Sequence, residues 1–208
     1  MTDVLKRIEA VRIVPVIAIN DAKDADALAG ALVSGGLPCA EVTFRTAAAA
    51  EAIRAMAKRG DILVGAGTVL TVDQAKQAVD CGAAFLVSPG TNPKVVQWAV
   101  DHDVSITPGI ATPTDIELAM GFGLKVLKFF PAESFGGVKT LKAISAPYGM
   151  LRFIPTGGIT EKNLAEYLAF DKVLAVGGSW MVKNELIAAG KFDQITELTK
   201  QAVAAARK

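Results

Sequence analysis

The feature that most constrains the fold is a regular alternation of short apolar segments with amphipathic segments of helical period. Buried strands are expected at residues 12–19, 39–45, 62–67, 84–88, 104–108, 125–130, 151–156 and 173–177. Helices are expected at residues 2–10, 21–33, 47–59, 71–81, 92–101, 113–120, 137–145, 161–169 and 191–206. After the short N-terminal helix, the chain therefore divides into eight consecutive strand–helix units.

Strict alternation of apolar strands with helices favours a parallel sheet that helices cover. We expect the α/β class and a (β/α)8 TIM barrel, with residues 1–208 forming one domain, because no linker or polar edge strand interrupts the units. An open, doubly wound sheet is the alternative. Its first strand–helix turn should carry a glycine-rich dinucleotide motif, of which Gly65–Thr68 is only a fragment.

The sixth expected strand carries a lysine among apolar side chains. Because side chains alternate between the faces of a strand, Val126, Lys128 and Phe130 share one face, and Leu127 and Phe129 share the other. A desolvated ammonium group must be paired or lose its proton, and the neutral amine attacks carbonyl carbons. Lys128 is therefore a candidate nucleophile. The alternative is a lysine that extends to solvent from the end of the strand.

The second expected strand carries a polar stripe. Glu41, Thr43 and Arg45 share one face by alternation, whereas Val42 and Phe44 occupy the other. If the first face lines a barrel, a carboxylate, a hydroxyl and a guanidinium project into an apolar interior. Packing does not explain three such groups, so this stripe is a candidate site. Exposure of the same face would require an open sheet.

Paired glycines follow the last two expected strands, in Pro155–Ile159 and Val176–Trp180. Glycine lets backbone N–H groups approach a ligand closely, and the start of a following helix favours an anion. Barrels often bind phosphate with the loops after these two strands. We therefore expect a phosphate site here, with two tight turns that bind no ligand as the alternative.

Composition argues against several classes of function. The formal net charge is +1 without a basic block, so no nucleic-acid partner is expected. No apolar stretch could span a membrane, and Asp3 and Glu9 interrupt any secretory signal, so we expect a cytoplasmic protein without a membrane partner. One histidine, His102, and two cysteines in apolar surroundings, Cys39 and Cys81, predict no metal site.

Taken together, these segments closely resemble the 2-keto-3-deoxy-6-phosphogluconate (KDPG) aldolase family, which overlaps with the 4-hydroxy-2-oxoglutarate (KHG) aldolases. The resemblance is carried by the motifs at residues 41–46, 64–69, 88–90, 108–110, 128–133, 136–138, 155–159 and 177–180. It implies a metal-free class I aldolase of (β/α)8 fold from the Entner–Doudoroff pathway. It also implies a homotrimer, a small-molecule substrate, and no cofactor beyond a covalent Schiff base.

The resemblance also implies roles for single residues. Lys128 would form the Schiff base, and Glu41 would be the general acid/base. The pyruvyl carboxylate would be bound by Arg45 and Thr68, in a pocket shaped by Pro89 and Phe130. The residues implied in phosphate binding are Arg12, Thr156, Gly157, Gly158, Gly178 and Ser179.

The implied reaction is the reversible cleavage of KDPG to pyruvate and glyceraldehyde 3-phosphate. One alternative keeps the chemistry but acts mainly on KHG or on 2-keto-3-deoxy-6-phosphogalactonate. A second is a phosphosugar-binding barrel without turnover, which has no need of Lys128 and Glu41. A third, a metal-dependent barrel epimerase, should carry histidine and carboxylate ligands at its strand ends.

Overall fold

The protein is described here by a computed structural model that covers residues 2–207, in which strands and helices alternate. The strands are β1 (Ile13–Ile17), β2 (Cys39–Thr43), β3 (Leu63–Gly67), β4 (Phe85–Val87), β5 (Ser105–Thr107), β6 (Gly109–Ile110), β7 (Val126–Phe129), β8 (Arg152–Pro155) and β9 (Val176–Gly178). The α-helices are α1 (Asp3–Val11), α2 (Ala25–Ser34), α3 (Ala49–Arg59), α4 (Val72–Asp80), α5 (Pro93–Asp101), α6 (Pro113–Gly121), α7 (Gly137–Ser145), α8 (Leu164–Leu168), α9 (Asn184–Ala188) and α10 (Phe192–Ala206). Two 3-10 turns, η1 (Ala22–Asp24) and η2 (Glu133–Phe135), precede α2 and α7.

The strands form parallel sheets, which confirms the predicted α/β class. Six strands pair in the order β5-β4-β3-β2-β1-β9, and three more pair in the order β6-β7-β8. The two sheets meet through isolated bridges, Phe153 with Val173 and Thr156 with Gly177. On the other side, the Lys128 N–H donates to the Pro108 carbonyl at 2.9 Å. The parallel sheet is therefore curled, with an inner and an outer face.

Proline interrupts the strand expected at 104–108. Pro108 has no N–H to donate to a neighbouring strand, so regular pairing stops there. Before it, β5 pairs with β4, and after it, β6 pairs with β7. The expected strand thus supplies only β5, and β6 just beyond it joins the other sheet, which the sequence pattern did not indicate.

Several other elements also differ from the expected ones. The last strand begins at Val176 rather than at residue 173, because Val173 makes only an isolated bridge to Phe153. Helix α8 is shorter than the helix expected at 161–169, and α9 was not predicted at all. Both helices are only five residues long, too short for a clear helical period.

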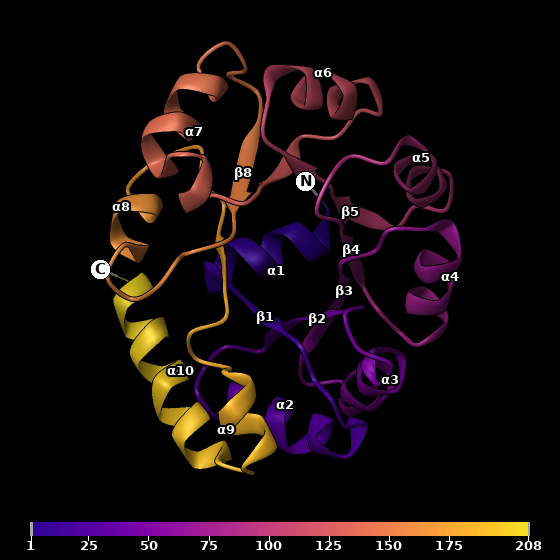
Figure 1. Cartoon of the computed structure of the whole chain (residues 1–208), viewed down its shortest axis with the longest axis vertical. Helices are drawn as coiled ribbons and strands as arrows, with labels where there is room; N and C mark the ends of the chain where they lie inside the picture. Colours follow the sequence, from indigo (N-terminus) through magenta and orange to yellow (C-terminus); the bar gives the residue numbers. More distant parts are fainter. Residues whose placement is uncertain (1, 208) are drawn as a thin grey trace.

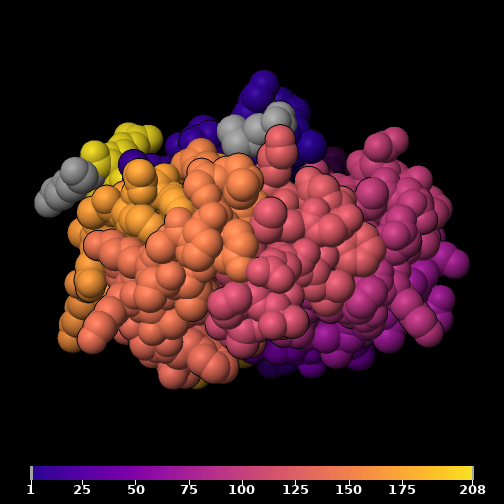
Figure 2. Space-filling model, turned by 90° about the horizontal axis from the view of Figure 1, so that it is seen from above, coloured from indigo at the N-terminus to yellow at the C-terminus, as the bar shows by residue number. Residues whose placement is uncertain are grey.

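Two apolar clusters stabilise this arrangement. The larger lies between the outer face of the sheets and the surrounding helices, and the smaller lies on the inner face. Figure 1 shows α2 to α10 around the outside and α1 across the middle. From α1, Ile8 enters the inner cluster beside Val14, Cys39 and Leu63. Figure 2 shows indigo N-terminal atoms at the upper edge of the molecule. Because Cys39 and Leu63 are the first residues of β2 and β3, α1 covers the amino ends of the strands.

Candidate active site

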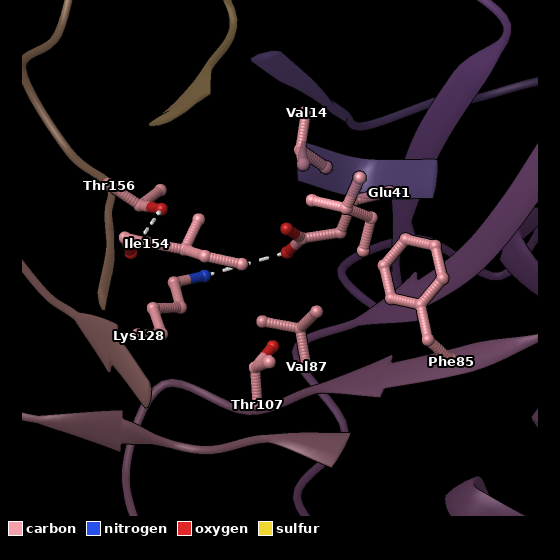
Figure 3. A pocket seen from close by; sticks show the side chains of 9 residues that line it. Val14, Glu41, Phe85, Val87, Thr107, Lys128, Ile154 and Thr156 are labelled. Carbon is pink, nitrogen blue, oxygen red and sulfur yellow. Dashed lines mark hydrogen bonds and ion pairs between the residues drawn. The ribbon is translucent and has the colours of Figure 1, made fainter. Parts of the chain in front are cut away.

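A buried ion pair joins β7 to β2 in the interior. The Lys128 Nζ lies 3.5 Å from the Glu41 Oε1, and the two residues are only 6% and 3% exposed. Figure 3 shows the two side chains pointing toward each other from opposite walls. Alternation along each strand explains their direction, because Leu127 and Val42 take the outer face. The structure thus brings together a lysine and a carboxylate that lie 87 positions apart in the sequence.

The walls around this pair are mostly apolar. Its pocket is lined by Ile8, Val14, Phe85, Val87 and Ile154, together with the hydroxyls of Thr107 and Thr156. An apolar wall raises the cost of charge and keeps bulk water away from the amine. The Phe130 ring adds a further contact, because its centroid lies 5.1 Å from the Lys128 Nζ. The predicted Phe130 therefore lies next to the lysine.

A second polar group stands at the end of β2. The Thr43 hydroxyl donates to the Ile17 carbonyl at 2.7 Å, and the Arg45 Nε–H donates to the Thr43 oxygen at 3.0 Å. These two bonds orient the guanidinium at the carboxyl end of the strand. Arg45 is exposed, and within residues 2–207 its terminal N–H groups donate to no protein atom. Such a planar group suits a carboxylate.

Thr68 and Pro89 follow the ends of β3 and β4, at the same end of the sheet. Thr68 has a φ of 56°, in the left-handed region, which is costly for a β-branched residue. Strain of this kind persists where neighbours hold the backbone, and it often marks functional sites. Here Phe44 N–H donates to the Gly67 carbonyl and Val69 N–H to the Val87 carbonyl, one on either side of Thr68.

The two glycine pairs lie on adjacent strand ends, as the sequence predicts. Gly157 and Gly158 have φ values of 102° and 79°, which only glycine adopts at low cost. Their loop pairs with the one after β7, because Glu133 N–H donates to the Gly157 carbonyl. Gly178 ends β9, Ser179 follows it exposed, and the bridge between Thr156 and Gly177 joins the two loops.

Two members of the predicted phosphate group lie elsewhere. The Thr156 side chain is buried and lines the lysine pocket rather than the loop. Arg12 precedes β1, at the amino end of the sheet, and its guanidinium donates to the Leu168 carbonyl at 2.9 Å. The Val176 N–H pairs with the Arg12 carbonyl, whereas Gly178 is level with Pro15. Arg12 therefore lies three residues below the glycine loop, and the structure does not bring it to the site.

The layer beneath the ion pair is neutral. Cys39 lies two residues before Glu41 on the same inner face and is buried. Burial, and then the nearby Glu41 carboxylate, raise the pKa of the Cys39 thiol to about 12. The thiol is therefore protonated at neutral pH and serves as packing, as predicted for both cysteines, which are free and buried.

Thr107 is a site residue that the sequence analysis did not identify. It is buried at the end of β5 and its hydroxyl lines the pocket of Lys128. The sequence could have indicated it, because the polar Ser105 and Thr107 alternate with the apolar Ile106, as the polar residues of β2 alternate with apolar ones. The lone His102 instead ends α5, where its ring stacks on Trp98.

Within residues 2–207, no three His, Cys, Asp or Glu side chains come together as a metal-binding group. In the same range, no helix is both long enough and apolar enough to cross a membrane.

Comparison with known proteins gives a consistent result. Residues 4–198 match the profile of the family described as aldolase, KDPG and KHG aldolase. The 2-dehydro-3-deoxy-phosphogluconate aldolase of Treponema pallidum is 54% identical over 202 residues, which cover 97% of this chain and 96% of the relative. The KHG/KDPG aldolase of Escherichia coli is 45% identical over 196 residues, 94% of this chain and 92% of the relative.

A solved structure is similar along its whole length. The crystal structure of KDPG aldolase from Legionella pneumophila superposes with a TM-score of 0.93 at 39% identity, covering 97% of this chain and 98% of the other. That crystal contains pyruvate captured at low pH as a covalent carbinolamine intermediate.

Proposed function

The chain belongs to the KDPG and KHG aldolase family, and on this premise we propose that it cleaves KDPG reversibly to pyruvate and glyceraldehyde 3-phosphate. The protein is a class I aldolase, a carbon–carbon lyase that needs no metal ion. The observation that carries the assignment to residues is the buried contact of 3.5 Å between Lys128 and Glu41.

Lys128 supplies the nucleophile. Its neutral amine adds to the C2 ketone to give a carbinolamine. The carbinolamine takes up one proton from water and its hydroxyl leaves as water, which leaves a protonated imine. When the C3–C4 bond breaks, its electron pair moves toward C2 and neutralises the iminium nitrogen, so an enamine forms instead of a free carbanion. Because this cation accepts the electrons, the bond cleavage requires no external cofactor. The apolar pocket excludes competing water from the intermediate.

Glu41 moves the protons. Its carboxylate accepts the proton of the C4 hydroxyl, directly or through one water molecule, as glyceraldehyde 3-phosphate departs. The resulting carboxylic acid then protonates C3 of the enamine, which gives the iminium of pyruvate. Water hydrolyses that iminium and releases pyruvate and the Lys128 amine. A carboxylate 3.5 Å from the amine in the resting enzyme lies within reach of both carbon centres once the imine forms.

The ends of the substrate are bound separately. Arg45, oriented by Thr43, binds the C1 carboxylate together with Thr68, and Pro89 and Phe130 shape the pyruvyl pocket. Gly157, Gly158, Gly178 and Ser179 bind the phosphate through backbone N–H groups and a hydroxyl. The position of Arg12 removes it from this proposal, and Thr156 moves to the pyruvyl pocket.

We further propose that the two sheets form one closed eight-stranded barrel, which with its helices makes up a single domain. The interruption at Pro108 makes β5 and β6 two parts of one strand, and the bridges between Phe153 and Val173 and between Thr156 and Gly177 join the sheets on the other side. The inner cluster draws side chains from both sheets, which supports closure.

The proposed assembly is a homotrimer in the cytoplasm. Large apolar side chains exposed on this chain support an interface between copies: Leu70, Val100, Leu118, Phe135 and Met150. The phosphorylated substrate carries several negative charges and crosses membranes poorly, which supports the cytoplasm as the compartment. Sedimentation should give three times the chain mass of 21.7 kDa, and a monomer would contradict the proposal.

KHG is the second candidate substrate, favoured by the similarity to a relative named KHG/KDPG aldolase. It shares the 2-keto-4-hydroxy acid part that Lys128, Glu41 and Arg45 would bind. It lacks the phosphate, so the glycine loops would contribute nothing to its binding. Comparison of kcat/KM on the two substrates decides which is preferred.

Borohydride trapping tests the proposal directly. Incubation with pyruvate and borohydride should reduce the imine, add one pyruvyl group to Lys128 and abolish activity. Activity should survive dialysis against EDTA. Lys125→Met removes an exposed lysine near the start of β7 and should label normally, whereas Lys128→Met should not label. Label that maps to Lys125 or Lys183 would overturn the assignment.

A further inference from the structure

Two glycines of β3 face the interior, and each leaves space that a neighbouring strand fills. In the sheet register, Gly65 pairs with Glu41 on one side and with Phe85 on the other. Gly67 pairs with Thr43, one inner-face position nearer the carboxyl end. Neither glycine lies in the left-handed region, so backbone conformation does not explain the absence of a side chain. Close approach of neighbouring side chains does.

The Phe85 ring occupies the space over Gly65. A Cβ atom at Gly65 would lie 2.3 Å from two atoms of the Phe85 ring. The ring therefore covers the position directly across from the Glu41 Cα. Figure 3 shows Phe85 beside Glu41, on the side away from Lys128. The Phe85 ring thus prevents the Glu41 side chain from lying over Gly65, the residue of β3 that pairs with Glu41.

The Glu41 side chain occupies the space over Gly67. A Cβ atom at Gly67 would lie 2.3 Å from the Glu41 Oε1, 2.7 Å from its Cγ and 2.9 Å from its Cδ. The same Oε1 lies 3.5 Å from the Lys128 Nζ. The carboxylate therefore leans toward the carboxyl end of the sheet, into the one place where it meets the amine.

We infer that Gly67 is a positioning residue for the proton-transfer step, because its missing side chain lets the Glu41 carboxylate lie at Lys128. This inference rests on the proposed function and deepens it. A methyl group at Gly67 would meet the Glu41 side chain rather than backbone, so the carboxylate has to move while the strand can stay in place. The reaction is more sensitive, because misplacing a catalytic group by about 1 Å can cost about 10²-fold in rate.

The test separates imine formation from proton transfer. Borohydride trapping with pyruvate requires only the Lys128 imine, whereas exchange of the pyruvate methyl protons in D2O also requires the carboxylate to act on C3. We expect Gly67→Ala to trap pyruvate as wild type does, with methyl exchange slower by about 10²-fold. An equal loss of trapping and exchange, or no loss of exchange, would overturn the inference.

A shorter carboxylate side chain at position 41 should restore part of the methyl exchange that Gly67→Ala removes. Glu41→Asp retracts the carboxylate by one methylene, away from the added Cβ. The double variant Gly67→Ala with Glu41→Asp should exchange at least about tenfold faster than the product of the two single effects predicts. Strict additivity would mean that the two positions do not interact, and the inference would be wrong.

Two matched variants complete the design. Gly65→Ala adds the same methyl group to the same strand against the Phe85 ring, so it should lower the melting temperature more than Gly67→Ala does. Gly149→Ala, where a Cβ meets no atom within 4 Å, should change neither readout. If Glu41→Gln exchanges normally or wild type traps no pyruvate, the proposed function itself fails. If both behave as expected and only Gly67→Ala exchanges normally, the Gly67 inference alone fails.

Discussion

The carboxyl ends of the strands and their amino ends differ in the side chains that they present to the interior. Toward the carboxyl end, Glu41 and Lys128 form a buried ion pair, and Arg45, Thr68 and Ser179 follow the strands. Charged and hydroxyl groups in an apolar interior cost free energy of folding unless they are paired. This end of the molecule is therefore built for chemistry at some expense of stability.

At the amino end, apolar side chains fill the interior and helix α1 covers it. Ile8 packs there with Leu63 and Leu174. The polar contacts are peripheral, since Glu9 on α1 pairs with the partly exposed Arg152. The same strands thus carry the proposed catalytic groups at one end and packing side chains at the other. Substitutions at the two ends should separate activity from stability.

The largest expected effect is on substrate choice at the carboxyl end. Ser179→Asp places a negative charge against the phosphate and removes a donor, and repulsion of several kcal/mol corresponds to about 10³-fold in kcat/KM for KDPG. KHG never reaches this loop and should be cleaved normally. Arg12→Gln, which changes a cation at the amino end, should leave both substrates unaffected. Equal losses on both substrates after Ser179→Asp would mean that the loop is structural.

Glu41→Gln should slow turnover by at least about 10²-fold, the usual contribution of a general acid/base. The fold should persist, and some Schiff base should still form on Lys128. Steady-state cleavage and circular dichroism measure the two properties. Glu51→Gln, at an exposed ion pair with Arg54, is the control and should turn over normally. Near-normal turnover of Glu41→Gln would assign the proton transfer to another group.

Leu63→Ala at the amino end should show the opposite pattern. It removes buried methyl groups from the inner cluster and should lower the free energy of unfolding by about 2 kcal/mol or more. Denaturant titration measures the loss, and kcat/KM at a temperature where the variant is folded should stay near wild type. Lys139→Ala, at an exposed position of α7, should change stability by less than about 0.5 kcal/mol. If Leu63→Ala lost activity but kept its stability, the assignment of stability to the amino end and activity to the carboxyl end would be wrong.

The smallest effect concerns alkaline stability. Burial raises the pKa of Cys39 from 9.0 to about 12, so below pH 9 the thiol is protonated in both the folded and the unfolded chain. Between pH 9 and 12 the thiol loses its proton in the unfolded chain but keeps it in the folded chain, so the free energy of unfolding should fall as the pH rises through this range. Cys39→Ala should flatten this slope in denaturant titrations across that range. An unchanged slope would mean that other groups cause it.

Local pattern was sufficient for the order of elements and for the main catalytic candidates. Alternation within single strands grouped Lys128 with Val126 and Phe130, and Glu41 with Thr43 and Arg45, because side-chain direction in a strand depends only on position along it. Only closure of the sheet around an interior makes these the inner faces. The family motifs extended this to Arg45, Thr68 and the glycine loops. Short or interrupted elements were harder to predict, as α9 and the break at Pro108 illustrate, since five residues or fewer carry little periodic signal.

The sequence by itself determined the strand–helix order, the strand faces that carry Lys128 and Glu41, and the chemistry that such a pair supports. Only the tertiary structure decided that their atoms lie 3.5 Å apart and that Arg12 lies at the other end. It alone also decided that Gly67 leaves space for Glu41. The physical reason is the separation in sequence between the residues that interact. Periodicity and turn chemistry depend on residues that are close together in the sequence. Strand register and contacts across the interior join residues far apart, such as Glu41 and Lys128, 87 positions from each other, so they depend on how the whole chain packs.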